Sequence, residues 1–76
     1  FCENITIGFS QEFFVMVLQT GQNAVPFALT PQHMKRLAQY ATHQVKEYEQ
    51  KYGEIKTEWK PGIQSPIQTK DLLGEK

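Results

Sequence analysis

The hydrophobic and polar positions of this chain follow two different periods, and the change between them falls at Thr30. Up to Leu29, apolar side chains fall in three short runs, and in two of these they alternate with small or polar ones, the two-residue period of half-buried strands. From Pro31 onward they recur every three or four residues, the period of a helix with one apolar side. The pattern predicts an α+β fold in which strands are followed by one long helix.

Three strands are predicted before the helix. Residues 4–9 alternate, residues 13–18 are apolar at every position, and residues 24–29 alternate again. The connections between these runs are short, and residues 20–23 are typical of a turn, so we expect a three-stranded antiparallel β-meander. Because Pro26 has no N–H to donate, we expect the third strand to lie at an edge or to pair fully on one side only.

The predicted helix has clear signals at both ends. Thr30 can accept a hydrogen bond at the N-cap, Pro31 suits the first helical position, and Gly53 is a natural C-terminal stop. Between these ends the helix would run roughly 33 Å at 1.5 Å per residue. One amphipathic stripe follows it, and we expect this stripe to pack on one face of the sheet. Its members are Met34, Leu37, Ala38, Ala41, Val45, Tyr48 and Tyr52.

The composition changes after Gly53, where prolines, glycines and charged residues become frequent. We expect residues 1–53 to form the β-β-β-α domain and residues 54–76 to form an extended C-terminal tail. Trp59 and Ile63 are more apolar than a free tail requires. The tail is therefore a candidate to fold back on the sheet.

The strand that is apolar on both faces is the strongest functional signal. One helix covers one face of a three-stranded sheet, so either Phe14, Met16 and Leu18 or the opposite set would lie bare. Bare apolar patches on small domains are typical of interaction surfaces. We expect an interface formed by Phe14, Met16, Leu18 and Trp59, most simply between two copies of the chain in a homodimer. The alternative is that the tail covers this patch within one chain.

The small size of the chain and its single cysteine also favour stabilisation by a partner chain. A single domain of 76 residues buries only about 60% of the surface that its unfolded chain exposes, so it is marginally stable alone. The single cysteine, Cys2, excludes an intramolecular disulfide and fits a reducing compartment, so we expect a cytoplasmic protein. No apolar run approaches the ~20 residues that a membrane span needs.

The sequence holds no arrangement typical of catalysis. No hydroxyl residue lies in a nucleophile-elbow motif, and the glycines are isolated rather than gathered in a phosphate-binding loop. His33 and His43 would lie about 80° apart around a helix, which prevents them from sharing a metal. We therefore expect neither an enzyme nor a bound metal or cofactor.

The charge balance argues against nucleic-acid binding. Eight basic and eight acidic residues give a formal net charge of zero, whereas phosphate recognition usually needs a basic excess. A second, solvent-facing contact is expected at the helix start, at His33, Lys35 and Arg36. These residues also define the alternative function, a nucleic-acid or regulatory binding protein that uses the basic helix start.

Three stretches of the chain resemble the small prokaryotic family of unknown function DUF3467. They are Glu12-Phe-Phe-Val-Met-Val17, Leu29-Thr-Pro-Gln-His-Met-Lys-Arg-Leu37 and Tyr48-Glu-Gln-Lys-Tyr-Gly-Glu-Ile55. The resemblance covers about Asn4 to Ile55 and implies three strands followed by a helix, with no established activity. Some members are encoded near RNA polymerase large subunits, which implies a small accessory subunit beside a larger complex such as the transcription machinery.

The chain departs from the pattern of that family at two positions. Members often carry an acidic residue late in the second strand and a basic residue in the third, where this chain has Met16 and Pro26. A polar bridge between those two strands is therefore not expected here. The resulting hypothesis is a non-catalytic protein-interaction module that associates through its sheet.

Overall fold

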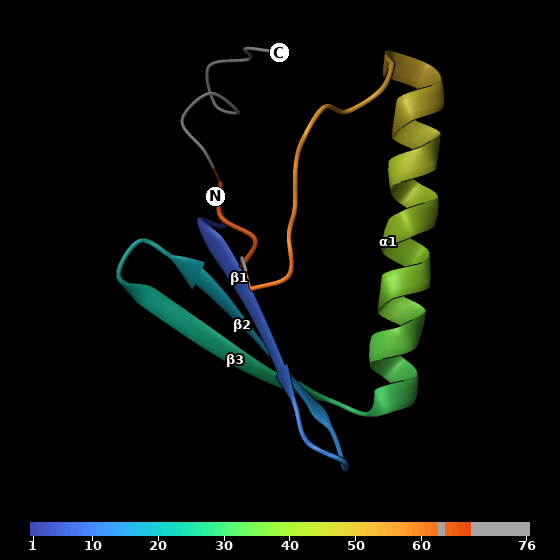
Figure 1. The fold of residues 1–76 in the computed structure, drawn as a ribbon. Coiled ribbons are helices and arrows are strands. Elements are labelled where there is room, and N and C mark those ends of the chain that lie inside the picture. Colours follow the sequence, from blue (N-terminus) through green and yellow to red (C-terminus); the bar gives the residue numbers. More distant parts are fainter. Residues whose placement is uncertain (63, 68–76) are drawn as a thin grey trace.

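The computed structural model describes residues 1–62 and 64–67 of the chain. This part forms a three-stranded antiparallel sheet of β1 (Asn4–Phe9), β2 (Phe14–Thr20) and β3 (Asn23–Leu29), followed by one helix, α1 (Pro31–Tyr52) (Figure 1). The strand order is β1-β2-β3, so each strand pairs with its neighbour in the sequence. The predicted α+β fold, a β-meander followed by one long helix, is confirmed, and β3 lies at an edge as Pro26 indicated.

A two-residue turn, Gly21-Gln22, joins β2 to β3. Gly21 has a φ of 59°, whereas no described non-glycine residue has a positive φ. A positive φ at the first central position alone is the pattern of a type II′ turn, whose twist suits antiparallel strands. Glu3 Oε1 accepts a hydrogen bond of 2.6 Å from the Gly21 N–H, so the start of the chain also holds this turn.

The register of the sheet gathers the large side chains on one face. Residues directly opposite in antiparallel strands point to the same side, and Ile7, Met16 and Phe27 are aligned in this way across the three strands. The Phe9 and Phe14 rings, which also lie opposite each other, have centroids 5.6 Å apart. We call this the apolar face. Its members are Ile5, Ile7, Phe9, Phe14, Met16, Leu18, Val25, Phe27 and Leu29.

A single residue, Thr30, separates β3 from α1. Its backbone is extended, and its Oγ1 accepts a hydrogen bond of 3.1 Å from the His33 N–H. This confirms the predicted N-cap, which satisfies one of the free N–H groups of the first turn. At the other end, Gly53 has a φ of 100° and donates its N–H to the Glu49 carbonyl at 2.9 Å, so the predicted stop is confirmed as well.

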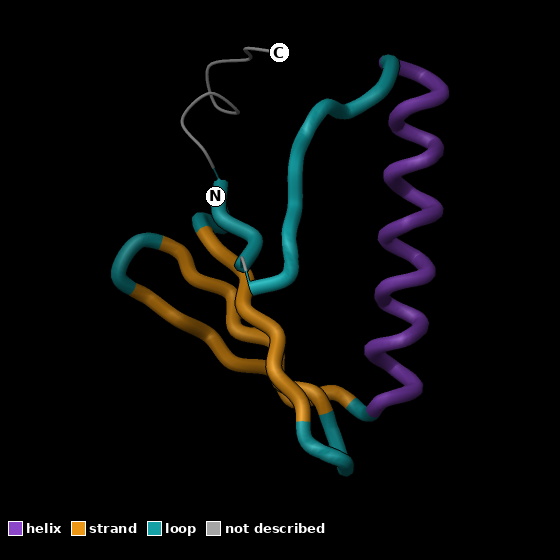
Figure 2. Tube along the Cα trace, in the orientation of Figure 1, coloured by secondary structure: helices purple, strands orange, loops and turns teal. Residues whose placement is uncertain are grey.

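After α1 the chain turns back toward the sheet. The Ile55 N–H donates to Glu49 Oε2 at 2.9 Å, and the connection then runs from the far end of the helix to the start of β1 (Figure 2). There, residues 65–67 make backbone hydrogen bonds with Glu3 and Ile5. We call residues 65–67 the edge strap. Ile63, which with Trp59 made the tail a candidate to fold back on the sheet, lies outside the described residues.

α1 packs on the sheet only at its beginning. Met34, at 8% exposed, is the one buried side chain among residues 1–62 and 64–67. Leu37, one turn later, is half-buried, and beyond it Glu49 is the only α1 residue that is not exposed. Figure 1 shows the first turns of α1 near the sheet and the rest of the helix rising away from it.

We predict that Thr30→Ala lowers the free energy of unfolding by about 1 kcal/mol, because the His33 N–H loses its acceptor. Urea unfolding followed by circular dichroism, at one fixed protein concentration, measures this change. Thr42→Ala is the matched control. The Thr42 Oγ1 donates to the Ala38 carbonyl at 2.8 Å inside the helix, and alanine has the higher helix propensity, so we expect no loss there. Equal losses in the two variants would contradict the capping role.

Candidate protein interface

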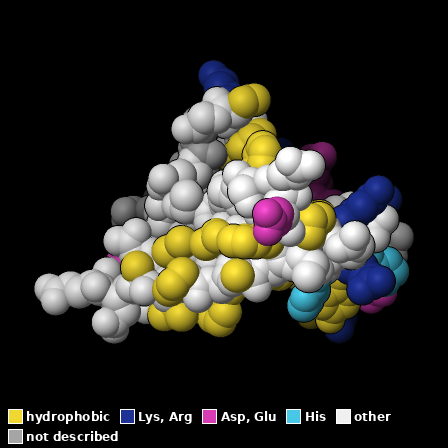
Figure 3. All heavy atoms as spheres, turned by 90° about the horizontal axis from the view of Figure 1, so that it is seen from below, with side chains coloured by type: hydrophobic (Ala, Val, Ile, Leu, Met, Phe, Trp, Pro, Cys, Tyr) yellow, Lys and Arg dark blue, Asp and Glu magenta, His cyan; other side chains and the backbone are white. Residues whose placement is uncertain are grey.

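One chain covers its own apolar face incompletely. In the central strand, Phe14, Met16 and Leu18 are half-buried. On the outer strands, Phe9 and Phe27 remain 79% and 47% exposed. The face that carries three of the predicted interface residues is therefore open to a partner. Figure 3, a view from below, shows that hydrophobic side chains also form a band on the outer surface of the molecule.

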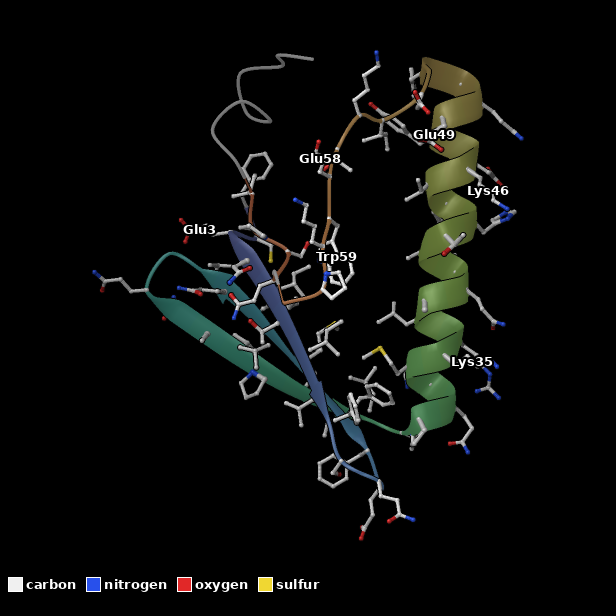
Figure 4. All side chains as sticks on the ribbon, in the orientation of Figure 1. Glu3, Lys35, Lys46, Glu49, Glu58 and Trp59 are labelled. Atoms are coloured by element: carbon white, nitrogen blue, oxygen red, sulfur yellow. The ribbon has the colours of Figure 1, made fainter. Side chains whose placement is uncertain are left out.

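Trp59, the fourth predicted interface residue, lies on the same side of the sheet. It lines an open hollow of about 360 Å³ together with Ile5 and Ile7, which belong to the apolar face. Figure 4 shows Trp59 between β1 and α1, on the segment that returns from the helix. Because Trp59 itself is 63% exposed, it covers this face only in part.

The apolar stripe of α1 extends the exposed apolar surface beyond the sheet. Val45, Tyr48 and Tyr52 follow Met34 and Leu37 along the same side of the helix, yet all three are exposed. The Tyr48 and Tyr52 rings, one turn apart, have centroids 4.9 Å apart and present a combined aromatic surface. The stripe that the sequence predicted is therefore present, but only its first two members pack.

The residues predicted as a second contact at the helix start are all exposed. His33, Lys35 and Arg36 lie in the first two turns of α1, and Lys35 points away from the sheet in Figure 4. Further along the helix, His43 Nε2 and Glu47 Oε1 lie 2.7 Å apart at the surface. The polar side of α1 thus carries both signs of charge, unlike the basic stripe typical of nucleic-acid binding.

In the part of the chain that the structure describes, no three His, Cys, Asp or Glu side chains come together as a metal site would require. No helix in that part is long and apolar enough to cross a membrane. Cys2 is half-buried and unbridged, and its Sγ donates to the Asn4 carbonyl at 3.3 Å.

Sequence reasoning missed two contributions to this site. It identified the apolar side of each strand, but it did not join Phe9 and Phe27 to the face of Phe14, because the register between strands is not readable from each run alone. It also missed the pairing of the edge strap with β1. No side-chain pattern marks that pairing, since it is made by backbone groups.

The family model for DUF3467, a protein of unknown function, matches residues 3–57. The chain belongs to this family. The match extends from just before β1 to just past α1, so it includes the apolar face and the stripe and leaves out Trp59 and the edge strap. No curated protein and no solved structure matches the chain.

We predict that Met34→Ala lowers the free energy of unfolding by about 2–5 kcal/mol, the usual cost of truncating a buried methionine. Urea unfolding at a fixed concentration measures the loss. Tyr40→Ala serves as the control, because Tyr40 is exposed and lies off the stripe, and we expect a change within about 0.5 kcal/mol. A loss below about 1 kcal/mol for Met34→Ala would show that this contact does not hold α1 to the sheet.

Proposed function

We propose that this chain is a non-catalytic protein-interaction module that forms a homodimer, in which the apolar face and stripe of each copy are covered by the other. The observation that carries the proposal is that the chain has many large apolar side chains on two surfaces and buries few of them. Nine large apolar residues share one face of the sheet and a stripe runs along α1, yet Met34 alone is buried among the described residues.

The exposure of the large apolar side chains supports this proposal. On the sheet, Phe9 and Phe27 are exposed, and along α1 the stripe residues Val45, Tyr48 and Tyr52 are exposed as well. A second copy that covers these side chains would remove apolar surface from water, which stabilises the assembly.

The sheet offers its face rather than its edges to a second copy of the chain. Thr20 and Asn23 close the hairpin, so ladder hydrogen bonds fall on this pair and on every second pair after it. Pro26 consequently occupies a position of β3 that faces the open edge, where it removes a donor. The edge of β1 already holds the edge strap. Face-to-face association is thus the arrangement that the edges favour.

We further propose that the dimer serves as a small accessory subunit of a larger protein complex in the cytoplasm. A single half-buried thiol, Cys2, is suited to that reducing compartment. The balanced charge of the chain favours protein partners over nucleic acid.

Light scattering over a range of concentrations tests the dimer, which should have twice the 8.8 kDa mass of one chain. We expect Phe27→Lys to give a folded monomer, because it places a charge in the apolar face at a side chain that is half exposed within one chain. Ala28→Lys, its neighbour on the opposite face of β3, should remain dimeric.

Circular dichroism of both lysine variants tests whether each of them is folded. The proposal fails if the unsubstituted chain stays monomeric at every concentration. It also fails if Phe27→Lys is folded and dimerises as tightly as Ala28→Lys does.

A further inference from the structure

The edge strap occupies the free edge of β1 in the manner of an added strand. Ile5 donates its N–H to the Ser65 carbonyl at 3.2 Å and accepts the Ser65 N–H at 3.1 Å. Two residues further along, the Ile67 N–H donates to the Glu3 carbonyl at 2.8 Å. The residue numbers on the strap rise as those on β1 fall, so the two segments run antiparallel with Ser65 opposite Ile5.

The contact between strap and β1 is short and open to solvent. Among the described residues, it consists of those three backbone hydrogen bonds, and next to the strap Asn4 Nδ2 donates to Gln64 Oε1. Gln64, Ser65 and Pro66 are exposed, and only Ile67 is half-buried. A segment held in this way can leave the edge without disturbing the three-stranded sheet.

The outer side of the strap is closed to further pairing. Because Ser65 and Ile67 turn their N–H groups toward β1, the backbone of Pro66 between them faces outward, where proline has no N–H. Pro26 does the same at the open edge of β3. β1 itself contains no proline, so its edge would be the receptive one if the strap left.

We infer that the edge of β1 is a binding site for an extended peptide that runs antiparallel to it, and that the edge strap is its built-in occupant. A peptide from another polypeptide would take the place of Ser65 opposite Ile5, donating and accepting one hydrogen bond there, and would donate to the Glu3 carbonyl two residues later. The two peptide residues that face β1 must not be proline. This site uses an edge of the sheet, so it is independent of the proposed dimer through the apolar face.

Residue-resolved amide exchange by NMR on the full chain tests the closed state. Ser65→Pro removes the N–H that donates to the Ile5 carbonyl and so releases the strap from β1. The Ile5 N–H then loses its acceptor, the Ser65 carbonyl, and we expect exchange of the Ile5 amide to rise at least 100-fold. Ser65→Ala keeps the N–H and should leave that amide protected. The Thr6 amide, which faces β2, should stay protected in both variants and so reports that the sheet is intact.

The second step adds a synthetic peptide of residues 61–69, at millimolar concentration, to the Ser65→Pro chain. We expect it to restore protection of the Ile5 amide and to bind the unsubstituted chain at least tenfold more weakly, because there the strap is in place. The same peptide N-methylated at residue 65 should not bind, whereas N-methylation at residue 64, whose N–H faces outward, should have no effect.

Two results would overturn the inference. One is an Ile5 amide that exchanges as fast in the unsubstituted chain as in Ser65→Pro, which would mean that the strap does not hold the edge. The other is a Ser65→Pro chain with an exposed Ile5 amide and a protected Thr6 amide that does not bind the peptide. Neither result bears on whether light scattering finds a dimer.

Discussion

Burial of Met34 is the packing contact on which the position of α1 relative to the sheet depends. Leu37 adds a half-buried neighbour, and the later stripe residues add none within one chain. Burial of apolar surface is the main stabilising force in folding, and the described part of this chain buries little of it. Its fold therefore depends on backbone pairing in the meander and on the N-cap at Thr30. In the proposed dimer, association would supply the burial that the described part of a single chain lacks.

The face and the edges of the sheet have separate tasks in this interpretation. The apolar face carries large side chains whose exposure favours a broad, non-directional contact, as suits a second copy of the chain. The edges carry directional backbone groups, and both are restricted, one by Pro26 and the other by the edge strap. Restricting the edges limits edge-to-edge pairing of this small sheet with other sheets.

The sequence predicted the elements well and their arrangement less well. Thr30 and Gly53 carry local signals, so both ends of α1 were predictable. The second and third strands extend one or two residues further toward the turn at Gly21 than their apolar runs, because Thr20 and Asn23 pair through the backbone whatever their side chains. The apolar face depends on register, and the edge strap depends on backbone groups far apart in the sequence. Neither feature produces a periodic pattern of apolar residues in the sequence.

Glu49 couples the length of α1 to the length of the chain that follows it. Its carbonyl accepts from Gly53 and its carboxylate from Ile55, and together these bonds reverse the chain at the end of a 22-residue helix. The returning chain must then cover the length of the rod before it can reach Ile5. An insertion of one helical turn would displace the reversal by about 5.4 Å and require roughly two more extended residues on the way back. In relatives that keep both ends of this path, insertions and deletions in the helix and in the connection should therefore occur together.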